Sequence, residues 1–398
     1  MGIGAAAAGV AAWRYWPEQG FWNPCHARLP RRLANHELVQ RAWDGIDAAQ
    51  VWDSHSHLIG TGDSGSGIYV SPRTESLLDP GQYARRLFFL NAGCVHDAAT
   101  GSVDRAYVER MRNLIDGMRR GAKMVLLAFE RAYDERGEPD LAHTIFHIPN
   151  AYAQDVARRH PEDFEWAASI HPYRKDALEA LEQAKRDGAR AVKWLPSAMG
   201  IDPASPRCDR FFEALTKLNL PLIAHAGLER AVLGREAHDF GNPLRLRRAL
   251  DAGVRVVVAH CASMGEDRDL DRGANGPYVD SFSLFTRVFD KYPSCYGDIS
   301  AMTQVNRAGP ALARVIENES WHARLLNGSD YPLPGVMPVF SVDYLVSLKM
   351  IPAAAADVLR EIRLHNPLLF DFVLKRNLRS NGRALAKRVF ETRTFFVR

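Results

Sequence analysis

The chain has 398 residues, of which 46% are hydrophobic and 25% are charged, with a formal net charge of +4. This composition is typical of a globular protein that can bury a sizeable core. A net charge this small, spread over this length, excludes a nucleic-acid-binding protein that relies on a strongly basic surface. The length suits one large domain or two ordinary ones.

The N-terminal segment is uncharged and rich in alanine from Gly2 to Ala12. It is shorter than the roughly 20 residues that span a bilayer, and it lacks the basic start of a signal peptide. It is therefore either a loose segment or short helix, or the remnant of a membrane anchor that begins upstream of Met1. Trp13, Tyr15 and Trp16, just after the run, would suit a membrane interface or a packed arm.

The cysteines are few, odd in number and without CxxC spacing: Cys25, Cys94, Cys208, Cys261 and Cys295. This set argues against a disulfide framework and against a zinc-finger type of site. It agrees with a reducing compartment, so we expect a cytoplasmic protein by default. A membrane-anchored or periplasmic protein is the alternative that the N-terminal run leaves open.

Short apolar runs alternate with helical patterns along most of the chain. Strands joined by helices in this order form a parallel sheet with right-handed crossovers. An α/β fold of the (β/α)8 barrel type, with an N-terminal extension over residues 1–44 and the barrel over 45–398, is the economical solution. The predicted strands are Val51–His57, Lys123–Phe129, Glu165–Ile170, Ala189–Leu195, Pro221–Ala226, Val254–His260, Ser294–Ser300 and Arg324–Asp330.

Two helices and one insertion have their own sequence signals. Asp176 and Glu179 have the spacing of a capping box for a helix that ends at Gly188. Ala356–Arg376 predicts one closing helix. A long insertion follows the first strand, over about residues 60–120, and opens with the Gly/Ser-rich loop Gly60–Gly67. In a barrel this loop is a candidate lid or substrate loop, with a flexible linker as the alternative.

Residues of metal-ligand type stand at the ends of the predicted strands. His55 and His57 lie two residues apart on the first strand, so both point to one side. The carboxyl ends of the strands of a parallel barrel meet at one mouth. The pattern therefore predicts a metal site there, formed by His55, His57, Lys193, His225, His260 and Asp330.

Each of these residues also has a structural explanation when taken singly. A lone histidine can be a hydrogen-bonded core residue, Lys193 can be a paired lysine, and Asp330 can cap a helix. Asp298 is a candidate to orient a ligand histidine, and Cys261 is expected to be a small buried side chain. His171 and Arg230 are weaker candidates, for a position beside the site and for binding a substrate carboxylate.

As a set, the residues His55-Ser-His57, Lys193, His225, His260 and Asp330 resemble the amidohydrolase superfamily. The flanking sequences Val192–Pro196 and Asn327–Pro332, with Asn366–Phe370 near the end, look like the branch called amidohydrolase 2. The resemblance extends from about residue 50 to about residue 375. It implies a barrel whose mouth binds one or two divalent cations.

The resemblance also implies roles for the residues. His55, His57 and Asp330 would hold one cation, and His225 and His260 would complete that site or hold a second cation. In binuclear members the lysine equivalent to Lys193 is carboxylated and bridges two ions, which is the form that we expect because both later histidines are present. In mononuclear members His225 binds the ion and His260 polarises the substrate. Zn²⁺ suits these ligands best, although other divalent metals also bind such sets.

We therefore expect a metal-dependent hydrolase that uses a metal-activated water to cleave a C–N or C–O bond, with Asp330, His260 and Lys193 as catalytic residues. Its partner would be a small-molecule substrate such as an amide, lactone or ester. A lyase on the same barrel, either a non-oxidative decarboxylase or a hydratase, is the first alternative. An inactive binding protein that retains the metal is the second. Membrane contact is expected only through the N-terminal run, and a homo-oligomer is compatible with the sequence.

Overall fold

A computed structural model of the chain describes residues 20–26, 28–95, 101–232 and 237–397. Eight parallel strands form a ring, as predicted. Their carboxyl ends hold most of the predicted site residues. The strands are β1 (Trp52–His57), β3 (Lys123–Leu127), β5 (Phe164–Ala167), β6 (Val192–Trp194), β7 (Leu222–His225), β8 (Val256–Ala259), β11 (Cys295–Asp298) and β12 (Leu325–Leu326).

The ring closes through two single parallel bridges. The strands pair as β1-β3-β5 and as β12-β11-β8-β7-β6. A bridge between Ala168 and Val192 joins β5 to β6, and one between Ser56 and Tyr331 joins β1 to the residues after β12. The strand order therefore follows the chain around a closed barrel, which is the arrangement of a TIM barrel. The fold prediction is confirmed.

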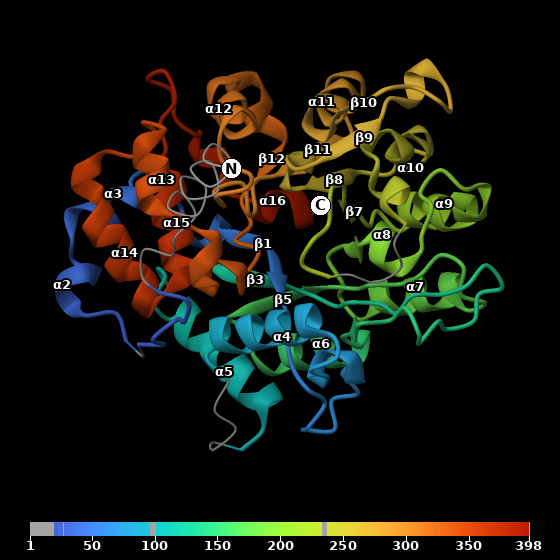
Figure 1. Ribbon diagram of the computed structural model, residues 1–398, viewed down its shortest axis with the longest axis horizontal. Coiled ribbons are helices and arrows are strands. Elements are labelled where there is room, and N and C mark those ends of the chain that lie inside the picture. The colour runs from blue at the N-terminus through green and yellow to red at the C-terminus, as the bar shows by residue number, and fades with distance from the viewer. Residues whose placement is uncertain (1–19, 27, 96–100, 233–236, 398) are drawn as a thin grey trace, which may run out of the picture.

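Apolar side chains fill the interior of the barrel. Trp52, Val125, Leu127, Ile223 and Val257 belong to a separate buried cluster. These residues alternate with others that pack against the outer helices, as the period of two along a strand requires. The C-terminal helix α16 (Arg393–Phe396) belongs to the same cluster and lies at the centre of the ring of strands (Figure 1). One end of the barrel is thereby filled, and the other carries the site.

The larger part of the core lies between the strands and the surrounding helices. Aromatic pairs such as Trp194 and Phe211, with ring centroids 5.4 Å apart, join these two layers. Among the described residues, the remaining α-helices are α2 (Arg31–Ala34), α3 (Glu37–Ala42), α4 (Pro80–Ala92), α5 (Val103–Ile115), α6 (Asn150–Arg159), α7 (Ala177–Arg186), α8 (Pro196–Met199), α9 (Asp209–Lys217), α10 (Arg247–Asp251), α11 (Ser281–Lys291), α12 (Pro310–Glu317), α13 (Val342–Ser347), α14 (Ala356–His365) and α15 (Pro367–Asn377).

Two of the helix predictions were wrong in detail. The closing segment forms α14 and α15 rather than one helix, because Pro367 forces Asn366 out of the helical conformation. The Asn366 side chain then caps α15 by accepting a hydrogen bond from the Leu369 amide at 2.9 Å. Asp176 precedes α7, but it does not cap it, because its carboxylate binds the Arg174 guanidinium at 2.7 and 2.9 Å.

The insertion after β1 packs against the mouth of the barrel. It contains α4, α5 and the short strand β2 (Tyr69–Val70), which pairs with β4 (Phe146–His147). The Asp104 carboxylate accepts hydrogen bonds from the amides of Thr61, Gly62 and Ser64, and from two serine hydroxyls of the loop. The loop Gly60–Gly67 is therefore fixed to α5 and is not a free linker.

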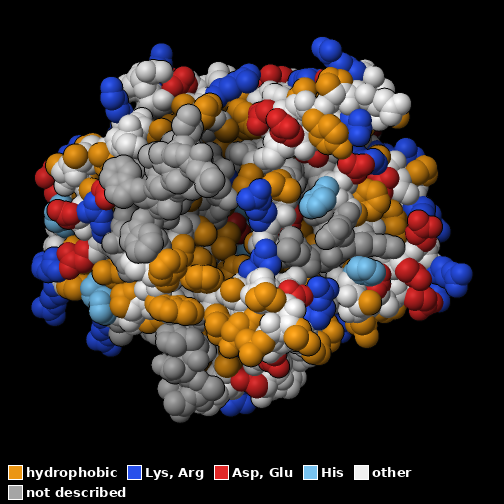
Figure 2. Space-filling model, viewed as in Figure 1, with side chains coloured by type: hydrophobic (Ala, Val, Ile, Leu, Met, Phe, Trp, Pro, Cys, Tyr) orange, Lys and Arg blue, Asp and Glu red, His pale blue; other side chains and the backbone are white. Residues whose placement is uncertain are grey.

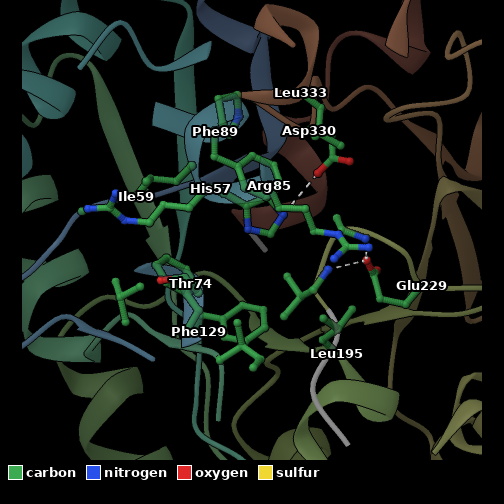
Figure 3. A pocket seen from close by; sticks show the side chains of 18 of the residues that line it. His57, Ile59, Thr74, Arg85, Phe89, Phe129, Leu195, Glu229, Asp330 and Leu333 are labelled. Atoms are coloured by element: carbon green, nitrogen blue, oxygen red, sulfur yellow. Dashed lines mark hydrogen bonds and ion pairs between the residues drawn. The ribbon is translucent and has the colours of Figure 1, made fainter. Parts of the chain in front are cut away.

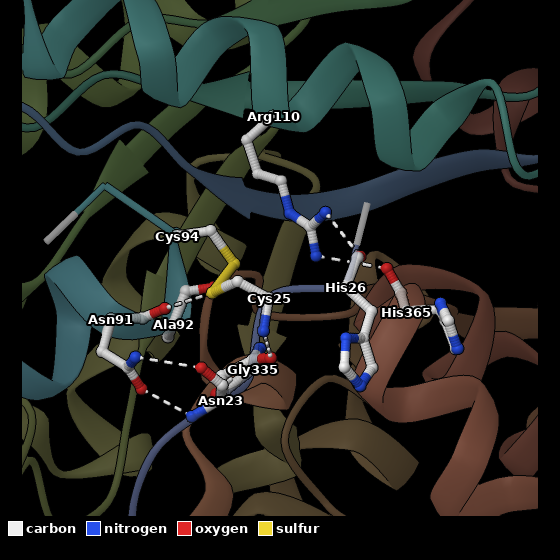
Figure 4. Close-up of a disulfide and its surroundings, with 9 residues drawn as sticks. All are labelled: Asn23, Cys25, His26, Asn91, Ala92, Cys94, Arg110, Gly335 and His365. Atoms are coloured by element: carbon white, nitrogen blue, oxygen red, sulfur yellow. Dashed lines mark hydrogen bonds between the residues drawn. A yellow bond between two sulfur atoms is a disulfide. The ribbon is translucent and has the colours of Figure 1, made fainter. Parts of the chain in front are cut away.

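The extension is tied to the barrel by a disulfide. Cys25 is bonded to Cys94, with Cα atoms 5.6 Å apart, while Cys208, Cys261 and Cys295 are free and buried. The expectation of no disulfide was wrong, because cysteines 69 residues apart in the sequence show no spacing signal. The two meet because residues 20–26 run beside the C-terminal end of α4 (Figure 4).

The described part of the extension is packed rather than loose. Trp43 packs against Phe372 of α15 with ring centroids 4.3 Å apart, and Leu33 and Val39 are buried in the main core. In the described residues we find no helix with the length and apolarity needed to cross a bilayer. The run Gly2–Ala12 lies outside the residues that the structure describes.

Replacing Cys25 and Cys94 together by alanine is expected to lower the free energy of unfolding by roughly 2–4 kcal/mol. The disulfide closes a loop of about 70 residues, which restricts the unfolded chain. Urea titration of both proteins measures the difference. A reducing agent should lower the stability of the wild type by a similar amount and leave the double variant unchanged. Equal stability of the two proteins would contradict the prediction.

Candidate metal centre

Three donor groups come together at the carboxyl end of the barrel. His55, His260 and Asp330 each offer one ligand atom, and these atoms all lie within 4.8 Å of one another. His55 Nε2 lies 3.4 Å from Asp330 Oδ1, and His260 Nε2 lies 3.8 Å from Asp330 Oδ2. All three residues are buried. One cation can therefore be shared among residues from β1, the turn after β8 and the turn after β12.

The other three predicted residues lie against this cluster. His57 Nε2 is 3.2 Å from Asp330 Oδ1, and Lys193 Nζ is 2.9 Å from His55 Nε2. The His225 ring lies 5.2 Å from the His260 ring, measured between centroids. The structure thus brings all six predicted residues to one mouth, although their separate roles stay predictions.

Two hydrogen bonds and one ion pair lie at the Nδ1 atoms of three histidine rings. Nδ1 of His55 faces Asp298 Oδ2 at 2.9 Å, Nδ1 of His260 faces the Ser300 carbonyl at 3.0 Å, and Nδ1 of His225 faces Glu229 Oε2 at 3.3 Å. A carbonyl or carboxylate oxygen can only accept, so each Nδ1 carries the proton. A neutral ring with its proton on Nδ1 has its lone pair on Nε2, which is the arrangement of metal-binding histidines with outer hydrogen-bond partners.

His225 provides the test of whether this site fits a cation. Its Nε2 is buried and has no hydrogen-bond partner among the described residues. An unpaired buried acceptor is costly unless a further group, such as a metal ion, binds to it. Its partner Glu229 is held in turn by the amides of Ala231 and Val232. The donor set of imidazole nitrogens and a carboxylate therefore fits a divalent cation.

Burial sets the charges of the histidines. Loss of solvation lowers the pKa of His225 to about 4, and it lowers the pKa of His57 and, more strongly, of His260. These three rings are therefore neutral near pH 7, with a lone pair available for a cation. Burial also lowers the pKa of Lys193, which increases the neutral fraction of its amine.

Two aspartates beside these histidines, Asp330 and Asp298, keep a low pKa in spite of their burial. Burial by itself would raise the pKa of Asp330, but the neighbouring His260 and His55 and the hydrogen bond with His57 hold it well below its usual range. Asp298 is likewise buried, and His55 together with Ser300 and His260 lowers its pKa below the usual range. Both carboxylates are therefore ionised at neutral pH and supply the negative charge that a cation requires.

Backbone geometry after the strands positions His260 and Asp330. Both have positive φ values, 54° and 59°, which are uncommon for residues with side chains. Such conformations gather at functional sites, where the surrounding structure holds them. Cys261, in the same left-handed turn, is buried and donates to the Asp298 carbonyl at 3.2 Å. It is a small buried residue as predicted, but the turn rather than strand alternation directs it.

Gly328 allows the segment that follows β12 to approach β1 closely. A Cβ at this position would lie 2.6 Å from the His55 Cβ, closer than such atoms come. The Ser329 amide, next in the chain, donates to Asp53 Oδ1 at 2.8 Å, and Asp53 Oδ1 also accepts from the His55 amide at 3.1 Å. A single carboxylate thus ties together the segments that carry His55 and Asp330.

An apolar cavity leads to this cluster. It has a volume of about 140 Å³, and Figure 3 shows His57, Asp330 and Glu229 facing the space that Phe89, Phe129 and Leu195 enclose. The residues of α4 that line it are Gln82, Arg85, Arg86, Phe89 and Leu90, and Gly60 and Thr61 of the insertion loop complete the wall. A cavity of this kind suits a small molecule with a substantial apolar part.

The structure also places three weaker candidates from the sequence, Asp298, His171 and Arg230. Asp298 orients His55, as predicted. His171 is buried outside the cavity, where its Nε2 faces the Met199 carbonyl at 3.0 Å and its Nδ1 accepts from the Tyr173 amide, so its role is structural. Arg230 is exposed and does not line the cavity. Sequence reasoning missed Glu229, although it stands four residues after His225, and it missed Ser300.

The family comparison agrees with this geometry. A family model described as Amidohydrolase matches residues 52–368, and the chain belongs to this family, in its amidohydrolase 2 branch. The match covers the strands that carry the six site residues. The chain is thus a member of a family of metal-dependent enzymes built on a TIM barrel.

Solved structures of similar shape are distant in sequence. An uncharacterised TIM-barrel protein from Bordetella bronchiseptica is 16% identical, with a TM-score of 0.49 over 78% of this chain and 94% of that one. A putative 2-pyrone-4,6-dicarboxylic acid hydrolase from Pseudomonas putida is 16% identical, with a TM-score of 0.43 over 81% and 97%. The 5-carboxyvanillate decarboxylase LigW from Sphingomonas paucimobilis is 12% identical, with a TM-score of 0.43 over 82% and 97%. No curated protein matches the chain.

Replacing Asp298 by asparagine is expected to weaken divalent metal binding by about 10- to 100-fold, because the His55 ring loses its charged acceptor. Competition with a chromophoric chelator measures the affinity. Glu165→Gln is the matched control, since Glu165 pairs with Lys123 and Arg190 on a different part of the barrel. Equal metal affinity in the Asp298 variant and the wild type would contradict the assigned orienting role.

Proposed function

We propose that the protein is a metal-dependent hydrolase that cleaves a C–N or C–O bond in a small molecule with a large apolar part. The observation that carries the proposal is the presentation of three Nε2 lone pairs beside an ionised Asp330 at the base of an apolar cavity. Amides, lactones and other esters have the electrophilic carbonyl that such a site attacks.

A bound cation would acidify a water molecule and polarise the substrate carbonyl, and Zn²⁺ is the ion that we propose. His55, His57, His225, His260 and Asp330 would together hold one or two such ions. Asp330 is ionised at neutral pH, so its carboxylate can accept a proton from the attacking water and return it to the leaving group. The apolar walls exclude bulk water from these proton transfers.

The tautomer of His260 bears on the number of cations. Its proton lies on Nδ1, which faces the Ser300 carbonyl, and burial keeps the ring neutral. Nε2 therefore has no proton to donate to a substrate carbonyl. This supports His260 as a metal ligand over His260 as a polarising acid, and with it the binuclear form of the site.

Lys193 would complete that binuclear form as a carbamate. Its amine is buried beside His55 Nε2, and the lowered pKa favours the neutral amine, which is the form that reacts with carbon dioxide. The new carboxylate would replace a poor cationic ligand by an anionic one. The same site with an unmodified lysine would hold one cation.

A decarboxylase is the second candidate, and Arg85 is the observation that favours it. Its side chain reaches the apolar cavity from α4, while its Nε donates to the Arg230 carbonyl at 3.1 Å. A guanidinium in this position can bind a substrate carboxylate. Release of carbon dioxide from an aromatic carboxylate, without hydrolysis of amides or lactones, would identify this activity.

The disulfide bears on the compartment. Structural disulfides are typical of proteins that fold in oxidising environments and are rare in the cytosol. The bond between Cys25 and Cys94 therefore supports a periplasmic or extracellular location over the cytoplasmic default. Mass spectrometry of the protein isolated under thiol-blocking conditions from each cell fraction tests this location.

Replacing Asp330 by asparagine is expected to lower kcat by about 10²- to 10⁴-fold, because the amide cannot accept the proton. The metal content should stay close to that of the wild type, since the histidines remain. Turnover of a panel of amides, lactones and aromatic carboxylates, together with elemental analysis, measures both quantities. Wild-type rates in the variant would remove the proposed role of Asp330.

For Lys193 we expect a carbamate and two cations per chain. Growth or incubation with ¹³C-labelled bicarbonate should give a carbamate carbon signal that the Lys193→Ala variant lacks, and the metal content of that variant should fall toward one ion. The control is Lys185→Ala, on α7. Lys375→Ala is not suitable as a control, because Lys375 is buried in an ion pair with Asp371. A single cation with an unlabelled lysine would contradict the binuclear form.

A further inference from the structure

Large apolar side chains are exposed together beside α4. Among the described residues, Phe21 and Trp22 are 49% and 50% exposed, and Leu77 and Leu78 are 77% and 97% exposed. Trp22 stacks on Phe88 of α4 with ring centroids 5.5 Å apart. Figure 2 shows hydrophobic side chains gathered over α4 and the segment that leads into it. We call the surface formed by these five residues the α4 face.

The aromatic part of this face is held by fixed contacts. The Asn23 amide donates a hydrogen bond to Asn91 Oδ1 at 2.7 Å, and Asn91 Nδ2 donates one to the Asn23 carbonyl at 3.2 Å. The disulfide between Cys25 and Cys94 follows two residues later (Figure 4). Phe21 and Trp22 precede this anchored stretch directly. The structure therefore holds two aromatic rings at the surface, where water contact is unfavourable.

The leucine pair protrudes from the other end of α4. Leu77 and Leu78 lie between the turn Pro72–Glu75 and the first turn of α4, which Asp79 caps. Two adjacent leucines with this exposure remove little apolar area from water in the folded chain. Exposed apolar patches of this kind mark surfaces that bind another apolar surface.

The α4 face and the cavity share one wall. Gln82, Arg85, Phe89 and other residues on one side of α4 line the cavity, while Phe88 packs against Trp22. A molecule that reaches the cavity past α4 thus passes an apolar surface. Charged residues on both sides of the leucine pair in the sequence are paired, Arg73 with Asp79 and Arg86 with Glu75.

The sequence before this face is also apolar. Residues 2–12 contain no charged residue, Trp13, Tyr15 and Trp16 follow, and the described chain begins at Gly20, immediately before Phe21. Tryptophan and tyrosine are enriched at the interface between lipid headgroups and acyl chains. Apolar residues from two separate parts of the chain therefore lie beside α4, and a segment that contains only Arg14 and Glu18 as charged residues joins the first of them to the uncharged run.

We propose that the α4 face binds the surface of a lipid bilayer, with Leu77 and Leu78 inserted deepest and Trp22 at the level of the headgroups. A bilayer is a broad surface that accommodates both ends of α4 at once, which suits a face made from separate segments. Because the neighbouring charges are paired, apolar insertion drives the binding, and neutral lipids suffice. This inference stands on exposed residues and is independent of the reaction proposed above.

The first experiment is cosedimentation of the full-length, metal-loaded protein with phosphatidylcholine vesicles. We expect the wild type to bind, and the Leu77→Ser/Leu78→Ser variant to show a partition coefficient at least about tenfold lower, because two leucines lose their transfer into lipid. Tyr278→Ser is the matched control, since Tyr278 is 55% exposed on the distant strand β10 (Tyr278–Asp280) (Figure 1). Circular dichroism verifies that all variants are folded.

Three results would overturn the proposal. These are no vesicle binding by the wild type, equal binding by the leucine variant, and binding that requires anionic lipid and disappears at high salt. The last would mean that charge rather than the apolar face drives association.

A second experiment distinguishes the bilayer from other occupants of the α4 face. Leu78→Cys carries an environment-sensitive fluorophore on the full chain, and its emission should shift to the blue only when vesicles are added. A blue-shifted emission before vesicles are added would mean that residues 1–19 or a second copy of the chain covers the face. Light scattering that shows a dimer in the wild type and a monomer in the leucine variant would likewise overturn the proposal.

Discussion

The site depends on the burial of several titratable groups at one end of a parallel barrel. Desolvation lowers the pKa of His225 and His260, while neighbouring histidines and hydrogen bonds hold the pKa of Asp330 and of Asp298 below the usual range in spite of their burial. The result is a set of neutral nitrogen donors around ionised carboxylates. Such a cluster is costly to bury without a cation. The local sign of that cost is the Nε2 of His225, which has no hydrogen-bond partner within the described part of the chain.

The acceptors behind the histidines decide which nitrogen faces the mouth. Asp298, the Ser300 carbonyl and Glu229 each occupy an Nδ1 and leave Nε2 for the cation. They come from β11, the turn after it and the turn after β7, so three segments must be in place before the donors are oriented. A rigid barrel supplies this pre-organisation, because its strand ends are fixed relative to one another.

The insertion after β1 supplies helix α4, which borders both the cavity and the exposed apolar face. Helix α4 lines the cavity with one side, and its other side meets the anchored arm that carries Phe21 and Trp22. The disulfide and the Asn23–Asn91 hydrogen bonds hold the arm on the C-terminal end of the helix. The wall of the cavity and the aromatic part of the exposed apolar face therefore share one helix.

The sequence by itself determined the barrel and the six residues at its mouth, because strand periodicity and ligand-type residues at strand ends are local signals. It also identified Asp298, which stands at the end of a predicted strand. It did not reveal Glu229 or Ser300, because their roles depend on which ring nitrogen of His225 and of His260 they contact. Nor did it reveal the disulfide, since Cys25 and Cys94 come together only when the arm packs on α4. Hydrogen-bond pairing, burial and long-range contacts are properties of the packed chain, so only the tertiary structure decided the tautomers, the charges and the apolar wall of the cavity.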